Sequence, residues 1–259
     1  MTPVEVVATL RAAGCVFAED EAALLEGEAT SMAELDALVA RRVAGEPLEQ
    51  IVGWADFAGV RVLLEPGVFV PRQRTALMVD EAVRLLDGVA DPVVLDLCCG
   101  SGAVGLAVAT RVPCDLVAAD VEPTAVRCAR RNLGPLHAQV LEGDLFEPLP
   151  ASLRGRVHVL TCNVPYVPTE AIASMPPEAR DHEPHVTLDG GADGLDVLRR
   201  VAGQARDWLA PGGSLLVEVG TRQVPDASTA FDRGGLTPRV VTDDEVGATV
   251  LVGTRSPAG

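Results

Sequence analysis

The fold is predicted best from the segment Val93-Val94-Leu95-Asp96-Leu97-Cys98-Cys99-Gly100-Ser101-Gly102-Ala103-Val104-Gly105. Its first residues read as a short buried strand, its glycines as a turn, and its small apolar residues as the start of a helix. Glycines allow a ligand to approach the backbone closely, and the amino end of a helix offers free N–H groups to a carboxylate or a phosphate. The segment therefore predicts a nucleotide-binding loop at the edge of an α/β sheet.

Acidic residues follow at the places where such a sheet binds a nucleotide. Asp120 ends the next apolar run, residues 116–119, at about the spacing from the glycine loop at which an acid holds ribose hydroxyls. Asp144 and Leu145 come directly after the third run. Taken alone, the glycine pattern with Asp120 fits a nicotinamide-dependent dehydrogenase equally well, because dinucleotide-binding folds share it.

A second motif, Asn163-Val164-Pro165-Tyr166, follows the apolar run of residues 157–162. It therefore belongs at the carboxyl edge of the sheet, where open α/β folds bind ligands. A planar amide or amine is a poor nucleophile, so an enzyme must orient it and accept its hydrogens. The Asn163 side-chain oxygen and the Val164 carbonyl can accept them, while Pro165 stiffens the turn and Tyr166 offers a flat surface. An ordinary Asn-x-Pro turn after a strand is the alternative.

The ordered series of Asp96, the glycine loop, Asp120, Asp144 and this turn resembles S-adenosylmethionine-dependent methyltransferases, in which an N-P-P-Y motif acts on planar nitrogens. A nicotinamide enzyme does not call for the turn, so a methyltransferase is favoured over a dehydrogenase. Flanking segments narrow the resemblance to the protein N5-glutamine methyltransferases that modify peptide release factors. These segments are residues 41–53, 57–60 and 66–72 upstream, and residues 182–185 and 188–195 downstream.

The resemblance implies a seven-stranded, mostly parallel Rossmann-like sheet preceded by a small helical domain and a linker with a β-hairpin. It implies S-adenosyl-L-methionine as the methyl donor and the side-chain amide nitrogen of a protein glutamine as the acceptor, with a release factor as the expected partner. Asn163, Val164, Pro165 and Tyr166 would be catalytic. The cofactor would contact Phe69, Arg72, Asp96, Cys98, Cys99, Gly100, Ser101, Gly102, Asp120, Asp144, Leu145 and Asn163.

Several residues depart from that family's pattern. Val164 stands where proline is usual, and Cys98 stands where the glycine loop usually starts with glycine. Because a side chain at a positive φ is strained, we expect ordinary backbone dihedrals at Cys98. Arg74 occupies the place of an acid, so the role of that acid cannot be transferred. The helical segment at the amino end is also shorter, which leaves open whether it docks a substrate protein or only stabilises the catalytic domain.

Apolar periodicity predicts the order of the elements. We expect a helical domain at residues 1–46, with helices at 4–13, 20–25 and 32–43, and with Ser31 and Glu34 forming a capping box. A linker at 47–72 carries a hairpin near residues 57–70, and the methyltransferase domain spans 73–259. Helices are predicted at 75–86 and after residues 102, 123 and 194. The predicted strands are 93–97, 116–120, 137–141, 157–162, 214–219, 238–241 and 248–252, the last two forming a closing hairpin.

The insert at residues 167–193 is a long, proline-containing connection after the catalytic turn. Long connections are often lids, so we expect it to shape the substrate channel, with Glu183 and Pro184 near the Asn163 turn. A plain surface connection is the alternative.

The net charge of −16 argues against nucleic acid as the substrate, because proteins that act on it usually present a basic surface to the phosphates. It does not remove the rival interpretation, an N-methyltransferase that holds a flipped base in the same turn. A ribosomal protein as the acceptor and a degenerate, non-catalytic scaffold are further alternatives. The oligomeric state stays open.

Cysteine spacing and hydropathy set the remaining expectations. The six cysteines form no C-x-x-C pair and no zinc-like spacing with the four histidines, so we expect no metal site and buried, reduced thiols. There is neither a signal peptide pattern nor an apolar run long enough for a bilayer. These features predict a cytoplasmic protein with no membrane partner.

Overall fold

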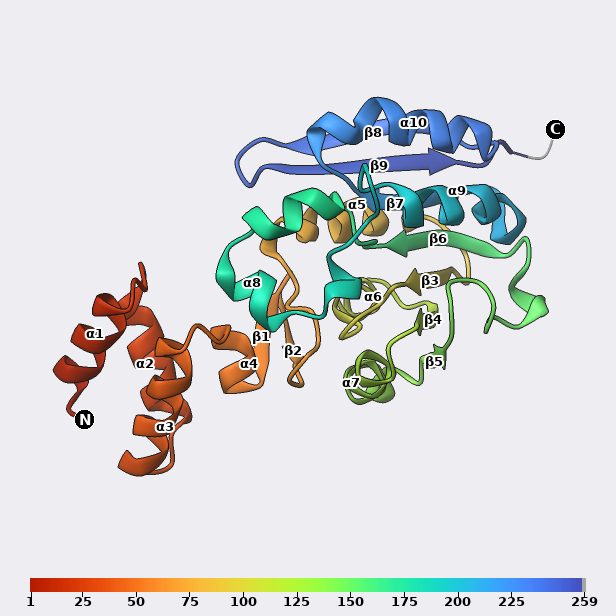
Figure 1. Ribbon diagram of the computed structural model, residues 1–259. Coiled ribbons are helices and arrows are strands. Elements are labelled where there is room, and N and C mark those ends of the chain that lie inside the picture. The colour runs from red at the N-terminus through yellow and green to blue at the C-terminus, as the bar shows by residue number, and fades with distance from the viewer. Residues whose placement is uncertain (258–259) are drawn as a thin grey trace.

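The computed structural model describes residues 1–257, and its core is a seven-stranded sheet with the order β5-β4-β3-β6-β7-β9-β8 (Figure 1). Strands β3 to β7 are parallel, whereas β9 runs antiparallel to both β7 and β8. The predicted fold class and closing hairpin are confirmed. Residues 258 and 259, the end of the predicted domain 73–259, lie outside the described residues. The strands are β3 Val93–Leu97, β4 Asp115–Asp120, β5 Gln139–Glu142, β6 Val157–Cys162, β7 Leu209–Glu218, β8 Thr237–Asp243 and β9 Ala248–Thr254.

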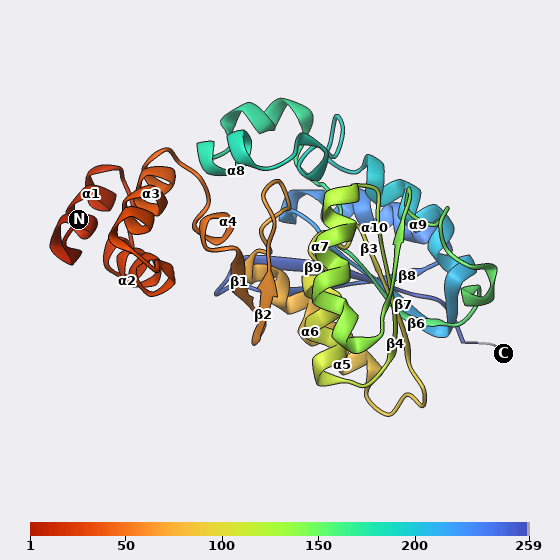
Figure 2. The ribbon, with the colours of Figure 1, turned by 90° about the horizontal axis from the view of Figure 1, so that it is seen from below.

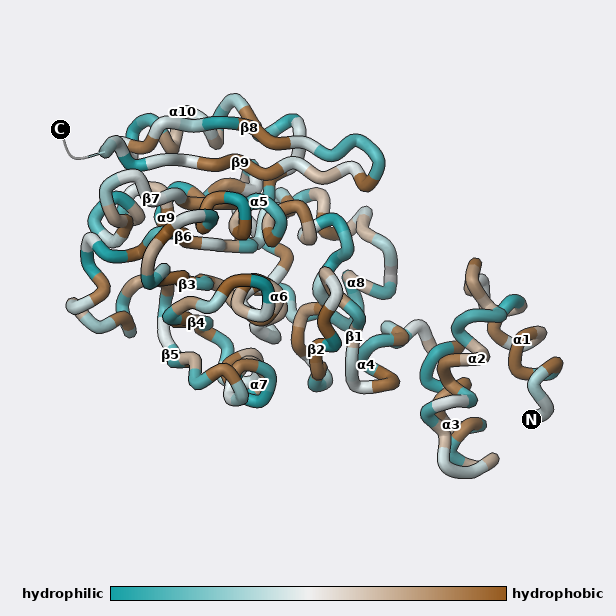
Figure 3. Tube along the Cα trace, turned by 180° about the vertical axis from the view of Figure 1, so that it is seen from behind, coloured by the Kyte–Doolittle hydropathy of each residue, from teal (hydrophilic) through white to brown (hydrophobic). Residues whose placement is uncertain are grey.

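Helices cover both faces of this sheet (Figure 2). Helices α5 Ala76–Leu86, α6 Ala103–Arg111 and α7 Pro123–Leu133 pack on one face, and α9 Asp196–Trp208 and α10 Val224–Arg233 pack on the other. Neighbouring residues of a strand point to opposite faces of the sheet. Val94 therefore packs in the core beneath α5, α6 and α7, and Leu95 packs in the core beneath α9 and α10. Burial on both faces explains why the parallel strands are continuous apolar runs, visible as a brown segment along β3 in Figure 3.

The order of the strands creates a crevice between β3 and β6. From β3 the chain adds β4 and β5 on one side, and then crosses back to place β6 on the other side of β3. Where the strand order reverses in this way, the connections after the two neighbouring strands run to opposite faces of the sheet. This leaves a crevice at the carboxyl ends of the strands. Because Leu97 pairs with Cys162, the glycine loop and the Asn163 turn begin side by side at this crevice.

The amino-terminal helices form a separate small core. They are α1 Pro3–Ala12, α2 Ala18–Glu28 and α3 Met32–Val43, and they lie beside the sheet domain in Figure 1. Their buried residues include Leu10, Leu25 and Val39, together with Ile51 of the short helix α4 Leu48–Val52. This core therefore extends past residue 46, and the predicted domain boundary stays a prediction.

Two local predictions were wrong. The hairpin consists of β1 Trp54–Phe57 and β2 Val60–Leu63, earlier than expected, because its two-residue turn is Ala58-Gly59, with φ values of 47° and 85°. Alanine is an unusual residue for such a turn, so the sequence signal is weak. The capping box of α3 is incomplete: the Ser31 hydroxyl accepts from the Glu34 N–H, but the Glu34 carboxylate accepts from Thr30 instead.

The remaining segments are short helical turns. Strand β5 starts after the predicted position because residues 134–136 form a 3-10 turn and His137 has a φ of 56°. The insert at 167–193 contains the helix α8 Pro177–His182 between two 3-10 turns, and Arg42 of α3 forms an ion pair with Glu178 of α8. The 3-10 helices are η1 Gln73–Thr75, η2 Gly134–Leu136, η3 Ala151–Leu153, η4 Thr169–Ser174, η5 His185–Thr187 and η6 Thr221–Gln223.

Between residues 1 and 257, no helix is long and apolar enough to cross a membrane.

The central strand should carry much of the stability. Leu160 of β6 is fully buried and pairs with both Leu95 and Leu215. We expect Leu160→Ala to lower the free energy of unfolding by about 2–5 kcal/mol, through lost burial and the cavity left behind. Val240→Ala on the edge strand β8, where the valine is exposed, is the control and should cost less than about 1 kcal/mol. Urea unfolding measures both variants, and equal losses would contradict the packing described above.

Candidate active site

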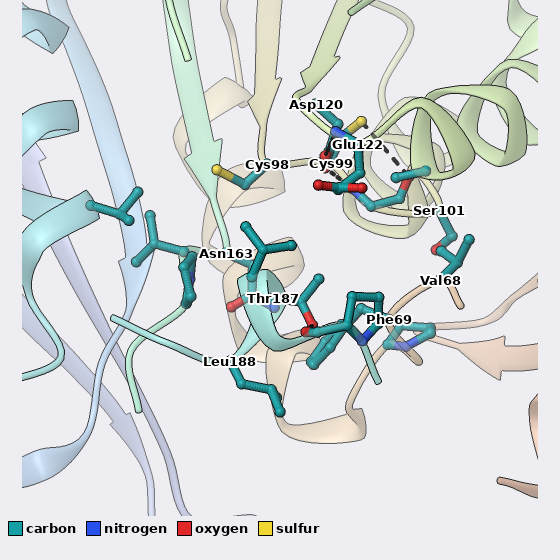
Figure 4. A pocket seen from close by; sticks show the side chains of 18 of the residues that line it. Val68, Phe69, Cys98, Cys99, Ser101, Asp120, Glu122, Asn163, Thr187 and Leu188 are labelled. Carbon is teal, nitrogen blue, oxygen red and sulfur yellow. Dashed lines mark hydrogen bonds between the residues drawn. The ribbon is translucent and has the colours of Figure 1, made fainter. Parts of the chain in front are cut away.

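A cavity of about 260 Å³ opens at the carboxyl ends of β3, β4 and β6 (Figure 4). Its walls come from the glycine loop, the end of β4, the turn after β6, the linker residues 67–75 and the insert residues 184–189. Apart from Gly102, every predicted site residue lines this cavity. These residues are Phe69, Arg72, Asp96, Cys98, Cys99, Gly100, Ser101, Asp120, Asp144, Leu145, Asn163, Val164, Pro165 and Tyr166.

The glycine loop turns sharply into α6. Cys98 has a φ of 51°, so the expectation of ordinary dihedrals at this residue is wrong. The loop needs this conformation because it leaves β3 and reverses within a few residues, and the partly buried Cys98 side chain packs against the core. Gly102, with a φ of 79°, lies behind the loop, where an added Cβ would meet the Leu133 side chain at 3.0 Å. Gly102 thus allows α6 to pack on α7 and does not face the cavity.

Asp120 is held by backbone groups on both sides. Its Oδ2 accepts from the Gly100 N–H at 2.8 Å, and its Oδ1 accepts from the Glu122 N–H at 2.9 Å. Burial raises the pKa of this carboxyl group, while these hydrogen bonds oppose the rise. A carboxylate oxygen can accept more than one hydrogen bond, so Asp120 retains capacity for the hydroxyls of a ligand.

Asp96 lies beneath the loop and connects three elements. Its two oxygens accept from the Gly105 N–H of α6 at 3.0 Å and from the Thr161 hydroxyl of β6 at 2.8 Å. The side chain is buried, and burial raises its pKa to about 7.

The turn after β6 presents an unsatisfied acceptor. Asn163 Oδ1 is buried and has no hydrogen-bond partner, a situation shared by only one other side-chain atom in the part of the chain that the structure describes, Glu26 Oε1. Buried polar atoms are nearly always paired, and Asn163 lines the cavity, so this oxygen is a candidate acceptor for a ligand N–H group. Val164 directs its side chain into the core on the α9 side, which anchors the turn.

Tyr166 is held by a network that includes a residue the sequence did not reveal, Glu218. Its hydroxyl donates to Glu218 Oε1 at 3.0 Å and accepts a hydrogen bond from Arg74. Burial and the Glu218 charge raise the pKa of Tyr166 to about 12, against the lowering effect of Arg74. Glu218 ends the apolar strand β7, beside β6. The sequence feature that could have indicated Glu218 as a site residue was an acid at the carboxyl end of a predicted buried strand.

Two further ion pairs close the site. Arg72 donates to both oxygens of Glu183, at 2.7 Å and 2.6 Å, which joins the linker to the insert. Glu183 therefore turns toward the linker, while the neighbouring Pro184 lines the cavity that Asn163 faces. At the opposite wall, Arg200 of α9 donates to Asp144 at 2.5 Å.

Cys98 and Cys99 are the two cysteines that line the cavity. All six cysteines are free, but only Cys99, Cys128 and Cys162 are buried as predicted, whereas Cys15, Cys98 and Cys114 are partly buried. Burial raises the pKa of the Cys99 and Cys162 thiols well above the usual range. Within residues 1–257 there is no group of three or more histidine, cysteine, aspartate or glutamate residues that could hold a metal.

Comparisons with known proteins agree with this geometry. A family model for a methyltransferase domain matches residues 94–182. The chain is 38% identical over 221 residues to a release factor glutamine methyltransferase of Geobacter sulfurreducens, and the alignment covers 84% of this chain and 76% of that protein. It is 36% identical over 203 residues to a 4-amino-L-phenylalanine/4-methylamino-L-phenylalanine methyltransferase of Streptomyces pristinaespiralis, covering 76% and 69% of the two chains.

Among solved structures, a methyltransferase from Pyrococcus furiosus superposes with a TM-score of 0.54 at 14% identity, covering 76% of this chain and 90% of that one. At this identity the likeness concerns the fold alone.

The raised pKa of Asp96 gives a testable pH dependence. Its folded-state pKa of about 7 exceeds the ordinary aspartate pKa of 3.8, so the folded protein binds this proton more tightly than the unfolded chain. The contribution of Asp96 to stability should therefore fall as pH rises from about 4 to about 7, by at most about 1.4 kcal/mol per pH unit, and stay level above.

Asp96→Asn removes the titration while keeping the shape. Urea unfolding of both proteins between pH 5 and pH 8 should show the stability of wild type falling relative to the variant as pH rises to about 7. A constant difference across this range would mean that Asp96 does not titrate there.

Proposed function

This chain belongs to the release factor glutamine methyltransferase family, and from that premise we propose that it methylates the side-chain amide of a glutamine in a peptide chain release factor. The buried, unpartnered Oδ1 of Asn163 at the cavity wall is the observation that carries the proposal. An acceptor in this position suits an N–H group of a planar amide. Such a substrate would place the reaction in the cytoplasm, where translation terminates.

S-adenosylmethionine is the methyl donor of this family, and the cavity residues fit it. Asp120 offers a carboxylate to ribose hydroxyls, the loop at Gly100 leaves open space for the methionine portion, and Asp144 with Leu145 borders the place for the adenine. Phe69 and Arg72 line the remaining wall, with the Arg72 guanidinium 4.8 Å from the Phe69 ring centroid. When bound, this cofactor supplies a methyl group made electrophilic by its positively charged sulfur.

The residues of the turn orient the acceptor. Asn163 Oδ1 and the Val164 carbonyl would accept the two amide hydrogens, which directs the nitrogen lone pair toward the methyl donor. These contacts strengthen as the nitrogen becomes pyramidal and positive, so they favour the transition state over the ground state. The methylated, positively charged nitrogen then releases one proton to solvent water, which restores the neutral amide. Tyr166, whose pKa is about 12, stays a neutral phenol and does not act as the base.

An aromatic amine is the second candidate acceptor. One relative is named a methyltransferase of 4-amino-L-phenylalanine and 4-methylamino-L-phenylalanine, and its alignment covers 76% of this chain. The same pair of oxygens could hold the planar amine of such a compound. Both acceptors are therefore tested in parallel.

Acceptor identity can be tested with a panel. Labelled S-adenosylmethionine would be incubated with the protein and, in parallel, purified release factors, 4-amino-L-phenylalanine, ribosomal proteins and DNA. We expect label on a release-factor glutamine, located by mass mapping. Label on the aromatic amine, a ribosomal protein or DNA would reassign the acceptor and keep the methyltransferase chemistry, whereas no binding of the cofactor would favour a non-catalytic scaffold.

Two variants should separate orientation of the acceptor from cofactor binding. Asn163→Ala should lower kcat by about 100- to 1,000-fold, because one pre-oriented acceptor is lost, with the Kd for S-adenosylmethionine within a few-fold of wild type. Asp120→Ala should mainly weaken cofactor binding. Calorimetry and single-turnover kinetics measure the two effects. Transfer at the parental rate by Asn163→Ala would refute the role given to this side chain.

A further inference from the structure

A closed hydrogen-bond network lies at one end of the cavity, around the carboxylate of Glu218. This side chain is 3% exposed. It accepts from three groups: Arg74 Nε at 2.8 Å, the Tyr166 hydroxyl at 3.0 Å and Thr75 Oγ1 at 2.6 Å. Arg74 also donates to the Tyr166 hydroxyl.

The network joins three separate segments of the chain. Arg74 and Thr75 belong to the 3-10 turn η1 at the end of the linker, Glu218 ends β7, and Tyr166 belongs to the turn after β6. Arg74, Thr75 and Tyr166 all line the cavity that Asn163 faces. The network therefore holds the linker against the turn that orients the acceptor.

The hydroxyl of Tyr166 already makes hydrogen bonds within the protein. A phenol has one hydrogen to donate, and Tyr166 gives it to Glu218. Its oxygen receives a hydrogen bond from Arg74. With donor and acceptor both engaged inside the protein, the ring rather than the hydroxyl is available to a substrate. The Arg74 guanidinium lies 5.9 Å from the ring centroid, which places a cation at the limit of a favourable contact with the ring.

The charges of Arg74 and Glu218 depend on each other. A buried carboxylate without a cation is strongly unfavourable, whereas Arg74 is 43% exposed and would tolerate isolation better. The planar guanidinium reaches the carboxylate and the phenol with two of its N–H groups at once. A lysine ammonium would keep the charge but not this two-point geometry.

We propose that Arg74 is a positioning residue for methyl transfer: paired with Glu218, it holds the ring of Tyr166 so that the ring confines the plane of the acceptor nitrogen. The proposal rests on the proposed function only in assigning this end of the cavity to the acceptor. It applies equally to a glutamine amide and to an aromatic amine, since both are planar.

The network can be observed without any substrate. Tyr166 is the single tyrosine of the chain, and all 21 basic residues are arginines, so no lysine titrates in the alkaline range. Tyrosinate absorbance in the near ultraviolet therefore reports the pKa of Tyr166 alone. Glu218→Gln should lower that pKa from about 12, because the carboxylate raises it, and Arg74→Met should move it upward. Circular dichroism of the same samples verifies that the fold persists.

Kinetics then test the positioning role. Arg74→Met should reduce kcat by about 10- to 100-fold with any acceptor that takes up label, while the KM for S-adenosylmethionine stays within about twofold. Arg74→Lys should restore part of the loss, since it keeps the charge. Arg233→Met, an exposed arginine at the end of α10, is the matched control and should match wild type in both kcat and the Tyr166 pKa.

The outcomes separate this proposal from the proposed function. A Tyr166 pKa unchanged by Glu218→Gln, or a wild-type kcat for Arg74→Met, would overturn the positioning role. A shifted pKa and a reduced kcat with an acceptor other than a release factor would support it and refute the release factor as substrate.

Discussion

The parallel pairing of β3 with β6 is the constraint on which the site depends. Leu97 and Cys162 are partners in this pairing, so the chain leaves both strands at the same level of the sheet. One exit becomes the glycine loop and the other becomes the turn that begins at Asn163. Neither segment could make a methyl-transfer site alone, because donor and acceptor must meet within van der Waals distance. The register of two strands brings them together.

Asp96 secures this junction from below. It accepts from the first turn of α6 and from Thr161 in β6, so one side chain ties the loop, the helix and the neighbouring strand. The arrangement places a carboxyl group in a buried position where its ionised form is disfavoured, as its raised pKa reflects. Burial of Asp96 lowers the stability of the folded protein, but its two hydrogen bonds fix the glycine loop in place. Such a loss of stability is common at functional sites.

Ion pairs attach the linker and the insert to the sheet and to each other. Arg72 binds Glu183 of the insert, and Arg74 binds Glu218 at the end of β7. Both carboxylates are buried while both arginines reach the surface. The linker therefore lines the cavity with two arginines, Arg72 and Arg74, each of which is fixed by a buried carboxylate. A third pair, Arg42 with Glu178, joins the insert to the amino-terminal helices.

Linear patterns were enough to predict the order of the sheet strands, the loop at Gly100, the acid at Asp120 and the turn at Asn163, whereas the helices α4, α8 and α10 were not predicted. Each of these depends on apolar periodicity or on residues adjacent in the chain. Contacts between distant segments could not be read in the same way. The left-handed backbone of Cys98, the hairpin turn at Ala58 and the partners of Tyr166 arise from packing that overrides local preference. Glu218 looked like the end of a buried strand, and only the placement of β7 beside β6 made its carboxylate part of the site.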